Sequence, residues 1–230
     1  MTIILTPTFT PTVSTMAFAD MVPDISAYLQ GCPSLVIERT IRKIATDFCQ
    51  RAKPWVLDMV PVTLSPGVFE YAVTSPASYA EPTDIVEAFI IKPDGSKIEL
   101  EWQSYAAIRR AYPSWPEAAE GDPQYIAATE VGKVLLAPVP DAVGDLYMRA
   151  AVRPTADALV WEQWLYDEFK RVIFHGVLHE LLNMPNRPWT DMKASLLHGK
   201  QWTFLLNAGR DRANRGYNVG SLSVEMRPFA

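Results

Sequence analysis

Hydrophobic residues recur at helical spacing in two separate parts of the chain, one near each end. Residues 34–52 place isoleucines and Phe48 at every third or fourth position, which predicts an amphipathic helix. Residues 164–183 show the same spacing and predict a second helix. A last helix is expected to begin behind Thr190, a residue type that favours the N-cap, and to end near Asn214. The chain is therefore expected to carry helices at both ends.

Between residues 55 and 153 the period of the pattern changes to two, which is typical of half-buried β-strands. Turn-forming residues at 65–67, 93–95 and 131–132 separate the alternating runs, and the Pro-Asp-Gly sequence at 93–95 predicts the clearest hairpin. Residues 104–113 are expected to form a short helix across the sheet. This stretch thus predicts an antiparallel β region of about seven strands.

Together these elements predict the fold class α+β, in which an antiparallel helical bundle from both ends of the chain encloses a central antiparallel β insertion. The expected units are an extended N-terminal arm at 1–21, a helical domain at 22–54 and 154–216, an inserted β domain at 55–153 and a C-terminal tail at 217–230. Prolines interrupt the apolar start of the arm, which also lacks positive charge, so neither a signal peptide nor a membrane span is expected.

The composition suits a subunit of an assembly. Hydrophobic residues make up 49% of the 230 residues, whereas charged residues make up only 20%, which is low for a chain that keeps its whole surface in water. Nineteen prolines against eleven glycines indicate stiff connections. Two cysteines, Cys32 and Cys49, are too few for a disulfide framework, so a reducing compartment is expected.

Charge is distributed unevenly along the chain. Residues 185–230 hold seven Lys or Arg and three Asp or Glu, so this end is basic although the whole chain has a net charge of −5. The remainder therefore carries a net charge of −9. Such polarity can orient one subunit against another, and Arg210, Arg212 and Arg215 are expected to face an acidic partner.

The histidines form the most obvious candidate for catalysis. His175 and His179 stand four residues apart on a predicted helix, a spacing at which two imidazoles can bind one zinc ion, and His198 is a conceivable third ligand. Position 176, however, holds glycine where a metalloprotease helix needs its glutamate base. Both histidines also fall on the polar face of the helix. Solvated surface histidines are therefore the preferred interpretation.

Other enzyme signatures are missing from the sequence. It contains no G-x-S-x-G elbow for a nucleophilic serine and no glycine-rich phosphate-binding loop. Four tryptophans are concentrated around the late helices, where they serve either core packing or a subunit contact: Trp161, Trp164, Trp189 and Trp202. The sequence thus favours a structural interaction protein, with no cofactor or metal, over an enzyme.

Two stretches carry a more specific pattern. Residues 28–56 read YLQGCPSLVIERTIRKIATDFCQRAKPWV, in which a helix ends in an aromatic-Cys pair followed by a tryptophan. Residues 153–191 read RPTADALVWEQWLYDEFKRVIFHGVLHELLNMPNRPWTD, in which Arg-Pro introduces the late helices and the linker carries Asn, Pro and Trp. In this order the pieces resemble the head-to-tail adaptor (connector) proteins of tailed bacteriophages, chiefly short-tailed ones.

The resemblance implies a structural protein of the virion neck or tail that is assembled in the host cytoplasm. Such proteins form a homo-oligomeric ring, expected to be a dodecamer, between the portal protein and the tail nozzle or tail fibre proteins. Double-stranded DNA would pass through the ring without sequence recognition. In this role the four tryptophans are the expected subunit interface, and the three arginines are the expected portal contact.

Three alternatives stay open at this point. A head- or tail-completion protein would occupy another level of the neck, and a monomeric binding module would form no ring. A metal-dependent hydrolase would use His175, His179 and His198.

Overall fold

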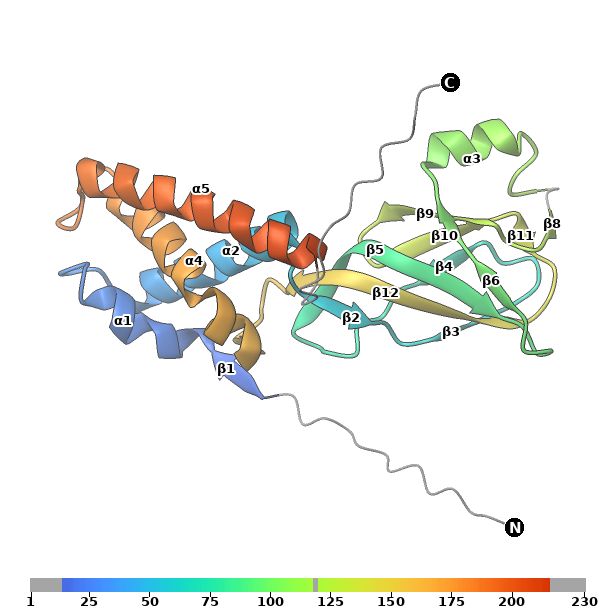
Figure 1. The fold of residues 1–230 in the computed structure, drawn as a ribbon, viewed down its shortest axis with the longest axis horizontal. Coiled ribbons are helices and arrows are strands. Elements are labelled where there is room, and N and C mark those ends of the chain that lie inside the picture. Colours follow the sequence, from blue (N-terminus) through green and yellow to red (C-terminus); the bar gives the residue numbers. More distant parts are fainter. Residues whose placement is uncertain (1–13, 118–119, 216–230) are drawn as a thin grey trace, which may run out of the picture.

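The computed structural model describes residues 14–117 and 120–215, so most of the expected arm and all of the expected C-terminal tail lie outside the described residues. The molecule is elongated, with helices gathered at one end and strands at the other (Figure 1). A single buried cluster extends from Phe18 in the helical part to Leu136 in the strand-rich part, so the two parts share one core. A smaller cluster lies around the buried Trp115.

Three long helices make up the helical part. They are α2 (Ser34–Ala52), α4 (Gln163–Leu182) and α5 (Met192–Arg215). The helical periodicity of the sequence is confirmed for all three. Lys53, which adopts the left-handed conformation with φ 51°, ends α2, and Pro54 prevents its continuation. The short elements η1 (Phe18–Met21) and α1 (Val22–Ser26) precede α2 along the lower edge of this part in Figure 1.

The expected N-cap of the last helix is wrong. Asp191, not Thr190, caps α5, because its carboxylate accepts a hydrogen bond from the Ala194 amide at 3.0 Å. The Thr190 hydroxyl instead donates to the Met184 carbonyl and closes the linker between α4 and α5. Thr190 therefore stabilises the linker rather than the start of the helix.

The larger sheet is built on two long antiparallel strands, β5 (Ala80–Ile91) and β12 (Gly144–Pro154). Three short strands complete this five-stranded sheet: β2 (Val56–Asp58), β3 (Val62–Leu64) and β6 (Lys97–Glu99). The hairpin predicted at 93–95 is confirmed, because β5 and β6 pair with Ile90 opposite Ile98. Gly95 supplies the positive φ of 84° that this turn requires.

The second sheet has the strand order β4-β10-β9-β7. Its strands are β4 (Glu70–Ala72), β7 (Glu101–Trp102), β9 (Tyr125–Glu130) and β10 (Lys133–Ala137). The hairpin expected at 131–132 is confirmed by the pairing of β9 with β10. The expected short helix is also confirmed as α3 (Tyr105–Ala111), whose buried Ile108 packs in the Trp115 cluster. A separate two-stranded sheet joins β8 (Glu120–Gly121) and β11 (Val139–Pro140).

The fold class is therefore α+β as expected, but a helical bundle with one central antiparallel insertion is wrong. The middle of the chain forms several sheets, and β7–β9 and β8–β11 pair in parallel. The strands on the two sides of the turn at 65–67 belong to different sheets, since β3 pairs with β12 and β4 pairs with β10. The Tyr71 hydroxyl fixes this turn by hydrogen bonds with the backbone of Ser65 and Val68.

The helical part also contains a small sheet of its own. Strand β1 (Thr15–Ala17) pairs antiparallel with β13 (Val160–Glu162) directly before α4. Phe18 and Met21 follow β1 and are buried in the core, although the sequence assigns both to the arm. The expected domain boundaries themselves stay a prediction.

Candidate functional site

Helices α4 and α5 run antiparallel and pack against each other and against α2 (Figure 1). Glycines permit the close approach. A Cβ atom added at Gly176 on α4 would lie 2.6 Å from Ile44 of α2 and 2.7 Å from Trp202 of α5. One at Gly199 on α5 would lie 2.8 Å from the His179 ring. The two helices are therefore closely packed, and the side of α5 that faces away from α4 is left exposed.

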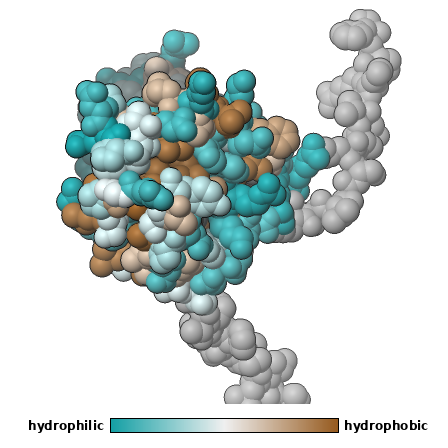
Figure 2. All heavy atoms as spheres, turned by 90° about the vertical axis from the view of Figure 1, so that its left-hand side faces the viewer, coloured by the Kyte–Doolittle hydropathy of each residue, from teal (hydrophilic) through white to brown (hydrophobic). Residues whose placement is uncertain are grey.

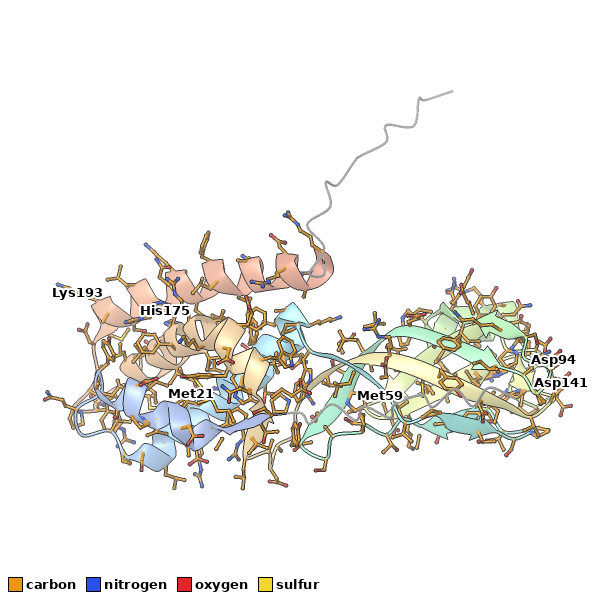
Figure 3. All side chains as sticks on the ribbon, turned by 60° about the horizontal axis from the view of Figure 1, so that its bottom comes forward. Met21, Met59, Asp94, Asp141, His175 and Lys193 are labelled. Atoms are coloured by element: carbon orange, nitrogen blue, oxygen red, sulfur yellow. The ribbon has the colours of Figure 1, made fainter. Side chains whose placement is uncertain are left out.

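The three candidate histidines lie between these helices rather than on a solvated face, so that interpretation is wrong. Nδ1 of His175 is 2.8 Å from Nδ1 of His198. Nδ1 of His179 is 2.9 Å from the Ser195 carbonyl oxygen, and the buried Ser195 hydroxyl donates to the His179 carbonyl. Figure 3 shows His175 on α4 beneath α5. The polar face of α4 is thus a polar helix–helix contact.

These contacts leave the hydrolase alternative without a ligand set among residues 14–117 and 120–215. No group of three or more His, Cys, Asp or Glu side chains in that part of the chain could hold a metal ion. His198 is paired with His175, while Ser195 engages His179. These hydrogen bonds hold α5 against α4, and the three histidine side chains do not converge on one metal position.

The histidine pair predicts a pH-dependent stability. Burial, followed by nearby positive charge, lowers the pKa of both His175 and His198. The unfolded chain therefore binds more protons than the folded one once the pH falls below about 6.5, the ordinary histidine pKa. The free energy of unfolding is expected to be constant above about pH 7 and to decrease from there to pH 5.5.

Urea unfolding between pH 5.5 and 8 measures this effect. Both rings are partly exposed, so screening keeps the slope below the limit of about 1.4 kcal/mol per pH unit for each histidine. The double variant His175→Asn, His198→Asn is expected to give a flatter profile than wild type. Equal slopes in the two proteins would contradict the assignment to this pair.

The four tryptophans occupy different environments. Trp161 has no exposed surface and packs against Phe18, with ring centroids 5.6 Å apart. Trp189 and Trp202 are partly buried against the core. Trp164 is 36% exposed, and its indole N–H donates to the Glu162 carboxylate. A subunit contact by these residues stays a prediction, and Trp164 is the most exposed of the four.

The three arginines lie in the last two turns of α5. Arg212 forms a salt bridge with Glu168 of α4, which ties the end of α5 to the helical part. Arg210 and Arg215 are exposed. Their expected contact with a portal protein stays a prediction.

The outward side of α5 carries a feature that was missed in the sequence. Leu197 and Phe204 are 66% and 69% exposed, and they stand seven residues apart on the side opposite the buried Ser195 and Leu206. Leu196 adds to this outer apolar face of α5, which we define as Leu196, Leu197 and Phe204. Figure 2, which views the free end of the helical part, shows hydrophobic side chains exposed among hydrophilic ones. A helical wheel of residues 192–215 would have shown apolar residues on both sides.

Helices that are apolar on opposite sides are usually buried on both. An elongated α+β chain with such a helix on its surface has the character of an assembly subunit. Residues 16–223 match the family described as SU10 adaptor protein, and the chain belongs to this family. No curated protein matches the chain.

The family confirms the coarser part of the resemblance, a structural adaptor protein of a bacteriophage. Such a role implies a virion component rather than an enzyme. Among the described helices, none combines the length and the apolar character that crossing a membrane requires.

Proposed function

We propose that this adaptor forms a homo-oligomeric ring in the neck of the virion, where it joins the portal to the tail and lets the genome pass. The observation that carries the proposal is the outer apolar face of α5, which one copy of the chain leaves exposed. Burial of Leu197 and Phe204 against another molecule would remove about 1.5–3 kcal/mol of unfavourable exposure for each side chain that becomes fully buried. Repetition around a closed ring supplies that burial to every copy.

The low charge content and the polarity of the chain support the same role. Within the basic segment 185–230, Arg210, Arg212 and Arg215 would face an acidic surface of the portal, and the more acidic remainder of the chain would repel DNA in the channel. The short-tailed virion, the dodecameric state and the contacts with nozzle or fibre proteins belong to this proposal.

Mixing the purified chain with its portal protein and imaging the product by electron microscopy tests the proposal. Rings seated on the portal are expected. Leu197→Asp and Phe204→Asp should each raise the concentration needed for ring assembly at least about tenfold, because each places a charge in the buried contact.

Val143→Asp provides the matched control. Val143 is also an exposed large apolar residue, but it lies in the strand-rich part before β12, so rings should form as with wild type. Absence of rings and of any complex with the portal in the wild-type protein would contradict the proposed function. If both α5 variants assemble like wild type, the outer apolar face of α5 does not take part in the ring contacts.

A further inference from the structure

A groove opens on the other edge of the helical part, between α1 and α4. It has a volume of about 580 Å³ and is lined by the aromatic side chains of Tyr28, Tyr166 and Phe174. Tyr28 is 63% exposed, and its ring meets Phe174 edge-on at 5.3 Å between centroids. In both Figure 1 and Figure 3, α5 follows one edge of the helical part and α1 the opposite edge. The groove extends to His175 beneath α5, but Leu197 and Phe204 lie on the side of α5 that faces away from α4 and cannot fill the groove of their own chain.

The rim of this groove is acidic on the side of Tyr166. Asp24 lines the groove together with Tyr166, and the pKa of the Tyr166 hydroxyl is raised, first by partial burial and then by the charges of nearby aspartates. The acids are Asp20, Asp24 and Asp167, and all three are exposed. Lys170, which lies 5.8 Å from the Tyr166 ring centroid, and Arg171 supply two positive charges along the same groove.

The outer apolar face of α5 has the opposite charge. Lys193 and Lys200 flank Leu197 along the same side of the helix, and no acidic residue occurs between Met192 and Arg210. Figure 3 shows Lys193 directed away from the helical part. An apolar centre with basic flanks thus faces outward on α5, and an aromatic groove lies between α1 and α4, with Asp24 at one place on its rim and Lys170 and Arg171 at another.

We infer that the outer apolar face of α5 in one copy docks into the α1–α4 groove of the next copy, with its lysines toward the aspartates of the rim. The inference rests on the proposed ring and names the two surfaces that build it. Two different surfaces of the chain make a heterologous contact, which can repeat from copy to copy and close into a ring.

A two-fold contact between two α5 helices is disfavoured by the same charges. It would place Lys193 and Lys200 of one copy near the lysines of the other, with no acid on this face to compensate. In the head-to-tail arrangement, Leu197 and Phe204 instead meet aromatic rings, a combination that is frequent at the centre of protein interfaces.

Thiol cross-linking of the full chain, in the presence of portal protein, tests the contact. The background is Cys32→Ser, since Cys32 is partly exposed, whereas Cys49 is buried and does not react. A variant with both Tyr28→Cys and Phe204→Cys, treated with a short thiol-specific cross-linker, is expected to give a ladder of covalent multimers. Each single variant should remain monomeric on a denaturing gel, and mixing the two should give dimers.

A variant with Val143→Cys and Phe204→Cys is the matched control and should give no ladder, because Val143 lies outside the groove. Rings visible by electron microscopy without the Tyr28–Phe204 ladder would overturn the inference and leave the proposed function standing. Cross-linking of Phe204→Cys to itself would overturn it as well, in favour of a two-fold contact. If the wild-type chain forms no ring on the portal, the proposed function fails, and this inference fails with it.

Discussion

Replacement of Trp161 by alanine is expected to lower the free energy of unfolding by about 3–5 kcal/mol, which is typical of a fully buried aromatic side chain. Trp161 has no exposed surface, and it joins β13 to the core beside Phe18. The removal of its ring leaves a cavity beside Phe18 in the core. For a chain of this length the loss corresponds to a decrease in Tm of roughly 6–20 °C.

Trp164→Ala is the matched control, because Trp164 lies three residues further along the chain and keeps 36% of its surface exposed. Its replacement is expected to cost roughly 1–2 kcal/mol, since less apolar surface returns to water. Urea unfolding of both variants as single chains measures the difference. Equal losses would show that Trp161 is not the structural anchor of β13. A stable Trp161→Ala chain that is defective only in assembly would show instead that Trp161 acts in a subunit contact.

The helices could be predicted closely because their signals are local. The apolar stripe of α2 and the stop at Lys53 and Pro54 lie within one continuous segment. The β5–β6 hairpin is equally local, since Pro-Asp-Gly places its two strands next to each other. Physical forces between neighbouring residues decide these elements, so the sequence alone shows them.

Apart from the two hairpins, the pairing of strands into sheets could not be predicted, because it joins residues that are distant in the sequence. Strand β4 pairs with β10 more than sixty residues later, as in Val134 opposite Tyr71. Strand β1 pairs with β13 more than 140 residues later, as in Ala17 opposite Val160. Alternation shows that a segment is a strand, but it does not identify the partner or distinguish parallel from antiparallel pairing.

The prediction that the histidines lie on a solvated face was wrong for a related reason. A helical wheel correctly separates His175 and His179 from the apolar stripe of α4, yet it cannot show that a polar face packs against another helix. Ser195 and His198 on α5 complete that contact. The sequence shows only that four tryptophans are concentrated around the late helices, whereas their burial ranges from complete for Trp161 to partial for Trp164. Only the packing of the whole chain distinguishes them.

Replacement of Gly176 is expected to have the second large effect on stability. A Cβ atom there would meet Ile44 at 2.6 Å and Trp202 at 2.7 Å, so α4 would have to move away from α2 and α5 together. Ile44 is β-branched and cannot easily adopt another rotamer in a helix. Gly176→Ala is expected to cost about 1–3 kcal/mol through overpacking, even though alanine by itself favours a helix by about 1 kcal/mol. Gly176→Leu should prevent the three helices from packing.

Two glycines on α5, Gly199 and Gly209, extend the test to a series of increasingly mild contacts. A Cβ at Gly199 would lie 2.8 Å from the His179 ring, and one at Gly209 would lie 3.1 Å from the Phe48 ring. The free energy of unfolding should therefore decrease most for Gly176→Ala and less for Gly199→Ala. Gly209→Ala should be close to neutral, since the helix preference of alanine offsets a mild contact. Urea unfolding followed by circular dichroism measures the series. A Gly176→Ala chain as stable as wild type would mean that α2 and α5 do not approach α4 this closely. A different side of α5 could then face outward.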